Sequence, residues 1–201
     1  MPTVLRQSTE SRQAEIIATM VQLSAERSPS EITTTDIAKA MKLTQGAIFR
    51  HFATKEAIRL AVVEWIEEHL MSKIMAAKES SPDALSALKA MFMAHVEFAK
   101  SHPGAPRLIF GELQQPAESP LKQRVQQVMQ RYRQTLSQTL NTAIETKLIR
   151  AEIDCQSATA LFLGAIQGLV IQAMLSGSTE QMEKQAVGVL HLYLAAIEVR
   201  T

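Results

Sequence analysis

The sequence predicts an all-α protein, and three observations support this class. Apolar residues make up 46% of the 201 residues, but aromatic residues only 4%. Ala, Leu, Ile, Met, Gln and Glu carry the bulk of the chain, a mixture that favours helices over strands. The seven glycines and seven prolines fall mainly between segments of helical periodicity, where they mark helix boundaries. A sizeable core and little disorder are expected.

Four helices are expected in the first third of the chain. The first has apolar residues at helical spacing and ends before the Ser-Pro-Ser sequence at 28–30. Threonines suited to N-cap positions precede the next three, and Asp36 lies three residues after the first of these threonines, near the positive end of the helix dipole. The expected ranges are 11–27, then 33–41 with Thr33 as cap, 45 to 51 or 52 after Thr44, and 55–78 after Thr54.

Five further helices are expected after residue 80. Pro82 can begin one of them, the sequence His-Pro-Gly-Ala-Pro at 102–106 is read as a break, and Asp154 is a suitable cap. The expected ranges are 82–101, 107–113, 121–148, 155–175 and 179–199. The prediction is therefore nine helices, with no convincing strand, fixed-period repeat or low-complexity tract.

The most apolar of these segments contains no charged residue over the 25 positions between Asp154 and Glu180, which is long enough to span a bilayer. Interspersed polar residues and the absence of a flanking basic cluster favour a soluble helix, so no membrane association is expected. Ala160, Gly164 and Gly168 recur every four residues and form a groove where another helix can approach closely. This is a first indication of a homodimer.

A cytoplasmic location is expected. The single cysteine, Cys155, has no partner for an intrachain disulfide, which favours a reducing compartment. Residues 1–20 contain charged residues and no long apolar run, so they do not resemble a secretory signal. The formal net charge is only +1, so nucleic-acid binding has to be argued from a motif.

The segment 32–55 contains such a motif. It consists of a short capped helix, a tight turn and a second capped helix, which is the spacing of a helix-turn-helix. Apolar residues expected to face its small core are Ile37, Ala38, Met41, Leu43, Ile48 and Phe52.

The polar and small residues left on the second helix suit contact with DNA. Gln45 can read a base edge in the major groove, while Gly46 and Ala47 allow close approach to the bases. Arg50 suits guanine or phosphate, and hydroxyl, imidazole and ammonium groups nearby suit phosphate oxygens. The predicted DNA-binding residues are Thr34, Thr35, Thr44, Gln45, Gly46, Ala47, Phe49, Arg50, His51 and Lys55. Residues 1–60 hold eight basic against six acidic side chains, a small excess in the expected half of the chain.

This segment resembles the DNA-binding region of the tetracycline-repressor-like (TetR) family of bacterial transcription regulators. The resemblance rests on the Thr-capped helix with Ile-Ala at 33–38, the run GAIFRHF at 46–52 and Lys-Glu-Ala at 55–57, and it covers roughly residues 12–62. Two departures are Phe49, where the family usually has a tyrosine that contacts phosphate, and Lys42, at a turn position where the family often has glycine.

The resemblance implies a helix-turn-helix domain over 1–54 and a ligand-sensing and dimerisation domain over 55–201. It also implies a homodimeric repressor that a small, mostly apolar effector releases from a palindromic operator, with no cofactor and no catalytic or metal site. Candidate pocket residues, chosen as large apolar walls with a few polar groups, are Trp65, Phe92, His95, Phe98, Phe110, Met129, Tyr132, Phe162 and Gln167. Candidate dimer-interface residues are Ala160, Gly164, Gly168, Met182, Ala186, Val189, Leu190 and Tyr193.

Four alternatives remain open at this point. The segment 11–55 could be the end of a helical bundle without a DNA role, and the last two helices could be ordinary core of a monomer. An enzyme is disfavoured because the sequence has no phosphate-binding Gly-rich loop, no Gly-x-Ser-x-Gly and no metal-ligand spacing. A helical adaptor that binds protein partners through its last helices would share the dimer evidence, but it leaves 34–55 unexplained.

Overall fold

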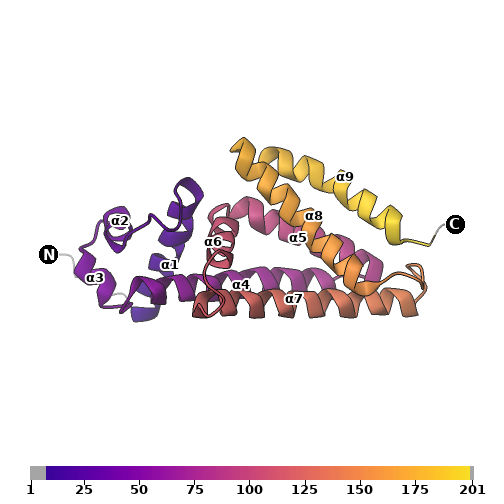
Figure 1. The fold of residues 1–201 in the computed structure, drawn as a ribbon, viewed down its shortest axis with the longest axis horizontal. Coiled ribbons are helices and arrows are strands. Elements are labelled where there is room, and N and C mark those ends of the chain that lie inside the picture. The colour runs from indigo at the N-terminus through magenta and orange to yellow at the C-terminus, as the bar shows by residue number, and fades with distance from the viewer. Residues whose placement is uncertain (1–7, 200–201) are drawn as a thin grey trace. The chain divides into compact units, whose positions relative to one another are not determined.

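The computed structural model describes residues 8–199, and this range contains nine α-helices with no strand apart from one isolated bridge between Ile149 and Glu198 (Figure 1). The all-α prediction is therefore confirmed. The helices are α1 (Thr9–Glu26), α2 (Thr34–Ala40), α3 (Gln45–Phe49), α4 (Lys55–Glu79), α5 (Ala84–Ser101), α6 (Gly104–Leu113), α7 (Pro120–Glu145), α8 (Cys155–Ser176) and α9 (Glu180–Ile197).

Within the described range the chain forms two compact units. Unit 1 comprises 8–66 and 102–125 and contains α1 to α3, the first half of α4, α6 and the start of α7. Unit 2 comprises 67–101 and 126–199 and contains the second half of α4, α5, the rest of α7, α8 and α9. These units are defined by compactness. The predicted division by function, into a DNA-binding domain over 1–54 and a ligand-sensing and dimerisation domain over 55–201, stays a prediction.

Threonine side chains cap the starts of α2, α3 and α4 as expected. Asp36 donates its backbone N–H to the Thr33 hydroxyl over 3.1 Å, and its carboxylate accepts from the Thr33 backbone N–H over 2.8 Å. Hydrogen bonds from the Thr33 hydroxyl and backbone, with the Arg27 guanidinium nearby, hold the pKa of Asp36 well below its usual range. The Thr44 and Thr54 hydroxyls accept from the backbone N–H groups of Ala47 and Ala57. Each cap satisfies a donor that the helix itself leaves free.

The predicted break before α6 is present but shorter than expected, because it covers only residues 102–103 and the helix begins at Gly104 rather than at residue 107. Prolines are tolerated in a first helical turn, where the backbone N–H groups lack intrahelical partners. Gly104 also packs directly on α1, since a Cβ there would lie 1.9 Å from the Val21 carbonyl oxygen. That contact between helices distant in sequence fixes the start of α6.

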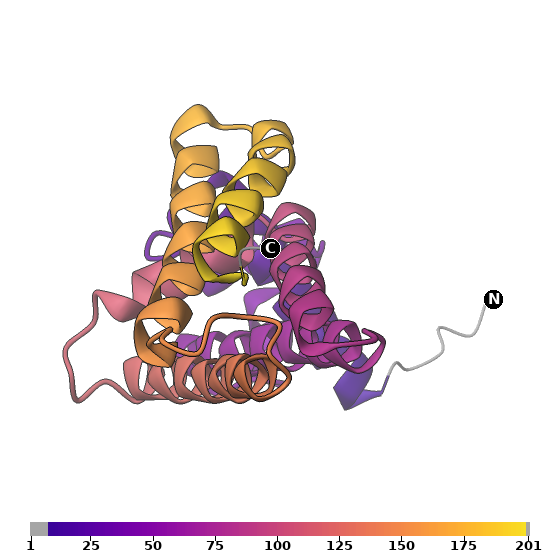
Figure 2. The ribbon, with the colours of Figure 1, turned by 90° about the vertical axis from the view of Figure 1, so that its right-hand side faces the viewer.

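Unit 2 is held together by the packing of α5, α8 and α9. Figures 1 and 2 both show α8 and α9 side by side. The rings of Phe92 and Tyr193 meet the Phe162 ring edge-on, with centroid separations of 5.3 and 5.5 Å. The end of α9 is held by Arg150, whose backbone N–H donates to the Ile197 carbonyl over 2.9 Å and whose guanidinium contacts the Ala196 carbonyl.

α7 ends three residues before the prediction, at Glu145. Lys147 adopts φ +58° and the Leu148 N–H donates to the Ala143 carbonyl over 2.9 Å, which closes the helix with a left-handed residue. α3 is also shorter than predicted and ends at Phe49.

α8 is the one helix among the described residues whose length and composition would allow it to cross a membrane, with a mean hydropathy of 1.8 over its most apolar window. In the structure 44% of that window is buried inside the protein. Phe162 and Ile166 are completely buried against the rest of unit 2. One side of α8 is therefore packed into unit 2, while apolar residues such as Leu161 and Leu175 are exposed on it.

Candidate nucleic-acid interface

A sharp turn joins α2 to α3 and sets the direction of the second helix. Lys42, just after α2, has φ +56°, and the Leu43 N–H donates to the Ala38 carbonyl over 2.8 Å. This left-handed helix end normally favours glycine, because a side chain there crowds its own backbone. The resemblance drawn from the sequence places glycine at this same position, and here the chain makes the turn with a lysine.

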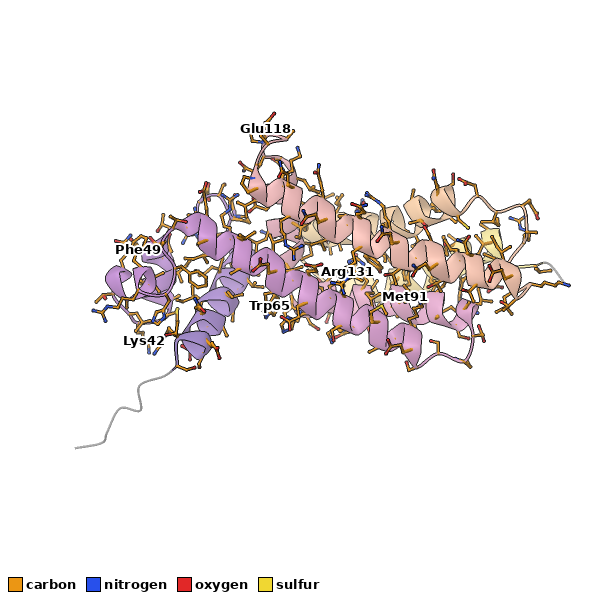
Figure 3. The ribbon with its side chains drawn as sticks, turned by 90° about the horizontal axis from the view of Figure 1, so that it is seen from below. Lys42, Phe49, Trp65, Met91, Glu118 and Arg131 are labelled. Atoms are coloured by element: carbon orange, nitrogen blue, oxygen red, sulfur yellow. The ribbon has the colours of Figure 1, made fainter. Side chains whose placement is uncertain are left out.

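The inward faces of the two helices are apolar, as predicted. Ile37 and Ile48 are completely buried, Ala38 is nearly so, and Phe52 closes the core behind α3. Phe49 faces outward, with 45% of its surface exposed. Figure 3 shows Phe49 and Lys42 at the end of unit 1 that α2 and α3 form.

Gln45, the first residue of α3, is exposed, but its side chain is not free. Its Nε2 donates to the Thr34 hydroxyl over 2.8 Å. Thr34 is only 7% exposed, so its hydroxyl has little surface for a phosphate and is engaged with Gln45. Two predicted DNA-binding residues are thus hydrogen-bonded to each other: Gln45 is exposed at the surface, and Thr34 lies buried behind it.

Gly46, beside Gln45 on α3, is exposed, and Ala47 is partly buried. A Cβ at Gly46 would meet nothing within 4 Å, so the fold itself does not require glycine there. Thr35, Thr44 and Arg50 are exposed as well. The residues exposed near the first turn of α3 therefore have small or polar side chains, which suits close approach to DNA bases.

Lys55 and His51, two of the predicted DNA-binding residues, already make hydrogen bonds within the protein. The Lys55 ammonium donates to the Ser30 carbonyl over 3.1 Å, and partial burial followed by repulsion from Arg59 lowers its pKa. The His51 carbonyl accepts from Gln13 Nε2 over 3.0 Å, while its Nδ1 is buried without a hydrogen-bond partner in the described part of the chain. The contact from Gln13 spans 38 positions in sequence, and no local signal could have indicated it.

Some of the basic side chains in this region form ion pairs with carboxylates, and others do not. Arg12 pairs with Glu15 over 2.7 Å and Arg27 pairs with Asp36 over 3.1 Å. The exposed cations Lys39, Lys42 and Arg50 have no such carboxylate partner in residues 8–199. The positive charge available to an anion is thus concentrated on α2, the turn and the end of α3.

The predicted pocket residues fall into two groups. Phe92, Phe98, Tyr132 and Phe162 are buried in unit 2, where the Tyr132 hydroxyl lies 3.3 Å from His95 Nδ1. Burial lowers the pKa of His95 to about 4 and raises the pKa of Tyr132. The remaining candidates are the partly buried Met129 and the exposed Gln167 in unit 2, and the partly buried Trp65 and Phe110 in unit 1. The ligand role of all nine residues stays a prediction.

The predicted dimer residues divide by exposure. Ala160, Gly164 and Gly168 are exposed on α8, and Val189 is half-buried. Four others are buried within unit 2, where they offer the protein's exterior almost no surface: Met182, Ala186, Leu190 and Tyr193. The interface role of all eight residues stays a prediction. The apolar periodicity of α9 identified a buried face, but it did not distinguish the face packed within the protomer from one open to a partner.

A different set of apolar side chains is exposed on these two helices. Leu175 is 76% exposed and Leu192 is 75% exposed. Leu161 and Ile171 on α8 and Val187 on α9 are about half exposed. With the exposed small residues of α8 they make up the set that we call the α8/α9 outer face: Ala160, Leu161, Gly164, Gly168, Ile171, Leu175, Val187 and Leu192.

Among residues 8–199, no group of three or more His, Cys, Asp or Glu side chains is arranged to hold a metal ion.

Comparisons with known proteins agree with this geometry. Residues 16–62 match the model of bacterial regulatory proteins of the tetR family, and residues 111–188 match that of a tetracyclin repressor-like C-terminal domain. The nucleoid occlusion factor SlmA of Haemophilus ducreyi is 32% identical over 121 residues, which span 60% of each chain.

Two solved structures share the fold over nearly the whole chain. The ketosteroid transcriptional regulator KstR2 of Mycobacterium tuberculosis is 22% identical, with a TM-score of 0.81 and coverage of 96% of this chain and 98% of that one. The transcriptional regulator FadR of Bacillus subtilis, in complex with stearoyl-CoA, is 19% identical, with a TM-score of 0.78 and coverage of 92% and 99%. The chain belongs to the tetR family of bacterial regulatory proteins.

Proposed function

We propose that this protein is a sequence-specific transcriptional repressor, without catalytic activity or cofactor, that acts in the cytoplasm as a homodimer on a palindromic operator. The observation that carries the proposal is the α2–turn–α3 unit, which presents exposed Gln45, Gly46 and Arg50 beside open cations at one end of unit 1. A recognition helix of this kind enters the major groove and reads base edges with its first residues.

A single unit of this size contacts only a few base pairs, so useful specificity requires two copies on a two-fold symmetric site. The α8/α9 outer face supports pairing of two protomers. Another helix can approach closely to a helix with exposed glycines. Covering the surrounding leucines removes their apolar surface from water, which favours association. A Cβ at Gly164 or Gly168 would meet nothing within 4 Å, so both positions are open in the protomer.

Release by a small, mostly apolar effector is the second part of the proposal. The His95–Tyr132 pair places two polar groups among buried aromatic rings of unit 2, a combination that can orient an apolar ligand. KstR2 is described as a ketosteroid regulator and the FadR structure holds stearoyl-CoA. A hundredfold loss of DNA affinity requires about 2.7 kcal/mol of differential effector binding between the two states.

A second candidate function is nucleoid occlusion, favoured by the name of the Haemophilus ducreyi relative. In that case cells lacking the protein would form division septa over unsegregated nucleoids. A repressor of metabolic or transport genes would instead leave septum placement unchanged and alter the transcript level of genes near its operator.

The proposed function is tested by selection from a library of random duplex DNA at physiological salt, where nonspecific attraction does not dominate. We expect enrichment of one palindrome. Gly46→Val is expected to fold like the wild type, because the site is open, and to lose affinity for that palindrome, because its side chain keeps α3 from the bases. Folded wild-type protein that enriches no sequence would contradict the proposal and favour a helical adaptor.

A further inference from the structure

The hydrogen bond between Gln45 and Thr34 restricts what the Gln45 amide can offer to DNA. An amide side chain has two N–H donors and one carbonyl acceptor. One N–H of Gln45 is taken by the Thr34 hydroxyl, 2.8 Å away. The carbonyl oxygen and one N–H remain for a base.

This remaining pair of groups matches one base in the major groove. Adenine presents a donor at N6 beside an acceptor at N7, and an amide pairs with both at once through its oxygen and one N–H. Guanine presents two acceptors, N7 and O6, so it would need both N–H groups of Gln45. With one N–H held by Thr34, guanine is disfavoured.

Thr34 is itself well placed to hold the amide. It is the first residue of α2, it is 7% exposed, and α2 is fixed at this end by the Thr33–Asp36 capping box. A glutamine at an exposed helix start otherwise loses rotamer freedom when it binds a base. Holding the amide before DNA arrives removes part of that cost.

We propose that Thr34 is a positioning residue for Gln45, and that the pair selects an adenine at one position in each half of the DNA site. This inference rests on the proposed function. In this proposal Thr34 holds the Gln45 side chain in place and does not contact a phosphate, and Gln45 contacts an adenine.

The experiment compares DNA selected from random duplexes by the wild type and four variants. Gln45→Met removes the amide, Thr34→Val removes the hydroxyl at nearly constant volume, and Thr34→Ser restores the hydroxyl. Thr9→Val is the matched control, because Thr9, like Thr34, is the first residue of its helix and is not among the predicted DNA-binding residues. Circular dichroism melting establishes that each variant is folded.

We expect the wild type, Thr34→Ser and Thr9→Val to select adenine at the same half-site position. Thr34→Val should keep the palindrome but lower the preference for adenine there by about threefold to tenfold, the usual worth of one hydrogen bond. Gln45→Met should abolish the preference. Two results would overturn the proposal: guanine at the half-site position whose preference depends on Gln45, or base frequencies selected by Thr34→Val that are identical to those of the wild type.

A second measurement keeps this inference apart from DNA binding. In the free protein, NMR order parameters of the Gln45 side-chain amide should report a rigid group in the wild type and Thr9→Val, and a flexible one below about 0.6 in Thr34→Val. A flexible wild-type amide overturns the positioning role whatever the DNA result. A wild type that enriches no sequence refutes the proposed function, and the base assignment falls with it.

Discussion

Arg59 and Glu112 form a two-pronged ion pair that joins α4 to α6 inside unit 1. The guanidinium Nε lies 2.8 Å from Oε1 and Nη2 lies 2.5 Å from Oε2, and Glu112 is only 1% exposed. α6 is also pressed against α1 at Gly104. Through these two contacts, α6 is tied both to the first helix and to the helix that directly follows the α2–turn–α3 unit.

Breaking this pair should destabilise the protein strongly. Glu112→Ala leaves the Arg59 charge without its partner, at an expected cost of about 3 kcal/mol in the free energy of unfolding, the low end for a buried pair because Arg59 keeps some solvent contact. Urea unfolding measures the change. Arg12→Ala, which breaks the more exposed Arg12–Glu15 pair, should cost less than about 1 kcal/mol. Equal losses in the two variants would contradict this assignment of burial.

The close approach of α6 to α1 makes a second prediction. Gly104→Ala is expected to lower the free energy of unfolding by about 2 kcal/mol, because the new methyl group would collide with the Val21 backbone. Gly111→Ala, in the same helix but with open space around it, should instead raise stability by up to about 1 kcal/mol. Thermal melting of the two variants side by side tests the opposite signs.

The left-handed residues Lys42 and Lys147 provide a matched pair for separating backbone from charge. Their φ angles are +56° and +58°, so replacement by glycine should change stability to a similar, small extent at both sites. Only Lys42→Gly is expected to affect DNA binding, by lowering the slope of log affinity against log salt by about one. An equal change in slope for Lys147→Gly would refute a phosphate contact by Lys42.

The partly buried His95 should make stability depend on pH. Its pKa in the folded protein, about 4, lies below the ordinary value of 6.5, so the unfolded chain binds the proton more readily. The stabilisation from neutral His95 is complete above pH 6.5 and is lost as the pH falls toward 4, with a slope of at most about 1.4 kcal/mol per pH unit. Urea unfolding at pH 7, 6 and 5 should show a shallower decline for His95→Phe than for the wild type.

Charge on the α8/α9 outer face should prevent dimerisation without unfolding the protomer. Gly164→Arg and Gly168→Arg place a cation where the protomer has open space, so circular dichroism should remain that of the wild type. Light scattering should report the mass of a monomer for both. Gln127→Arg, on the exposed side of α7, should remain a dimer; a dimer in all three variants would place the interface elsewhere.

The features predictable from sequence were those set by neighbouring residues. Thr33 with Asp36, Thr44 and Thr54 begin helices as expected, because a cap is a contact across three positions. The start of α6 was missed, because Gly104 is read locally as a helix breaker while its contact with α1 is formed only in the fold.

The candidate site shows the same division. The helix-turn-helix spacing and the exposure of Gln45 follow from periodicity, whereas the burial of Thr34 and its bond to Gln45 depend on how α2 and α3 pack together. On α9, periodicity separated apolar from polar positions. It could not show that Leu192 is open while Leu190 is buried, because both are apolar and only the packing of α5 and α8 distinguishes them.

The contact between Gly104 and the Val21 carbonyl also bears on how this chain can evolve. The obstacle to a side chain at 104 is a backbone oxygen, which every amino acid at 21 possesses, so no change of residue in α1 can make room for it. Among orthologues that keep this arrangement, position 104 should be invariant glycine while position 111, seven residues away, drifts freely. A lineage that replaces Gly104 must first have moved one helix away from the other, so its appearance in an alignment would mark a rearranged unit 1.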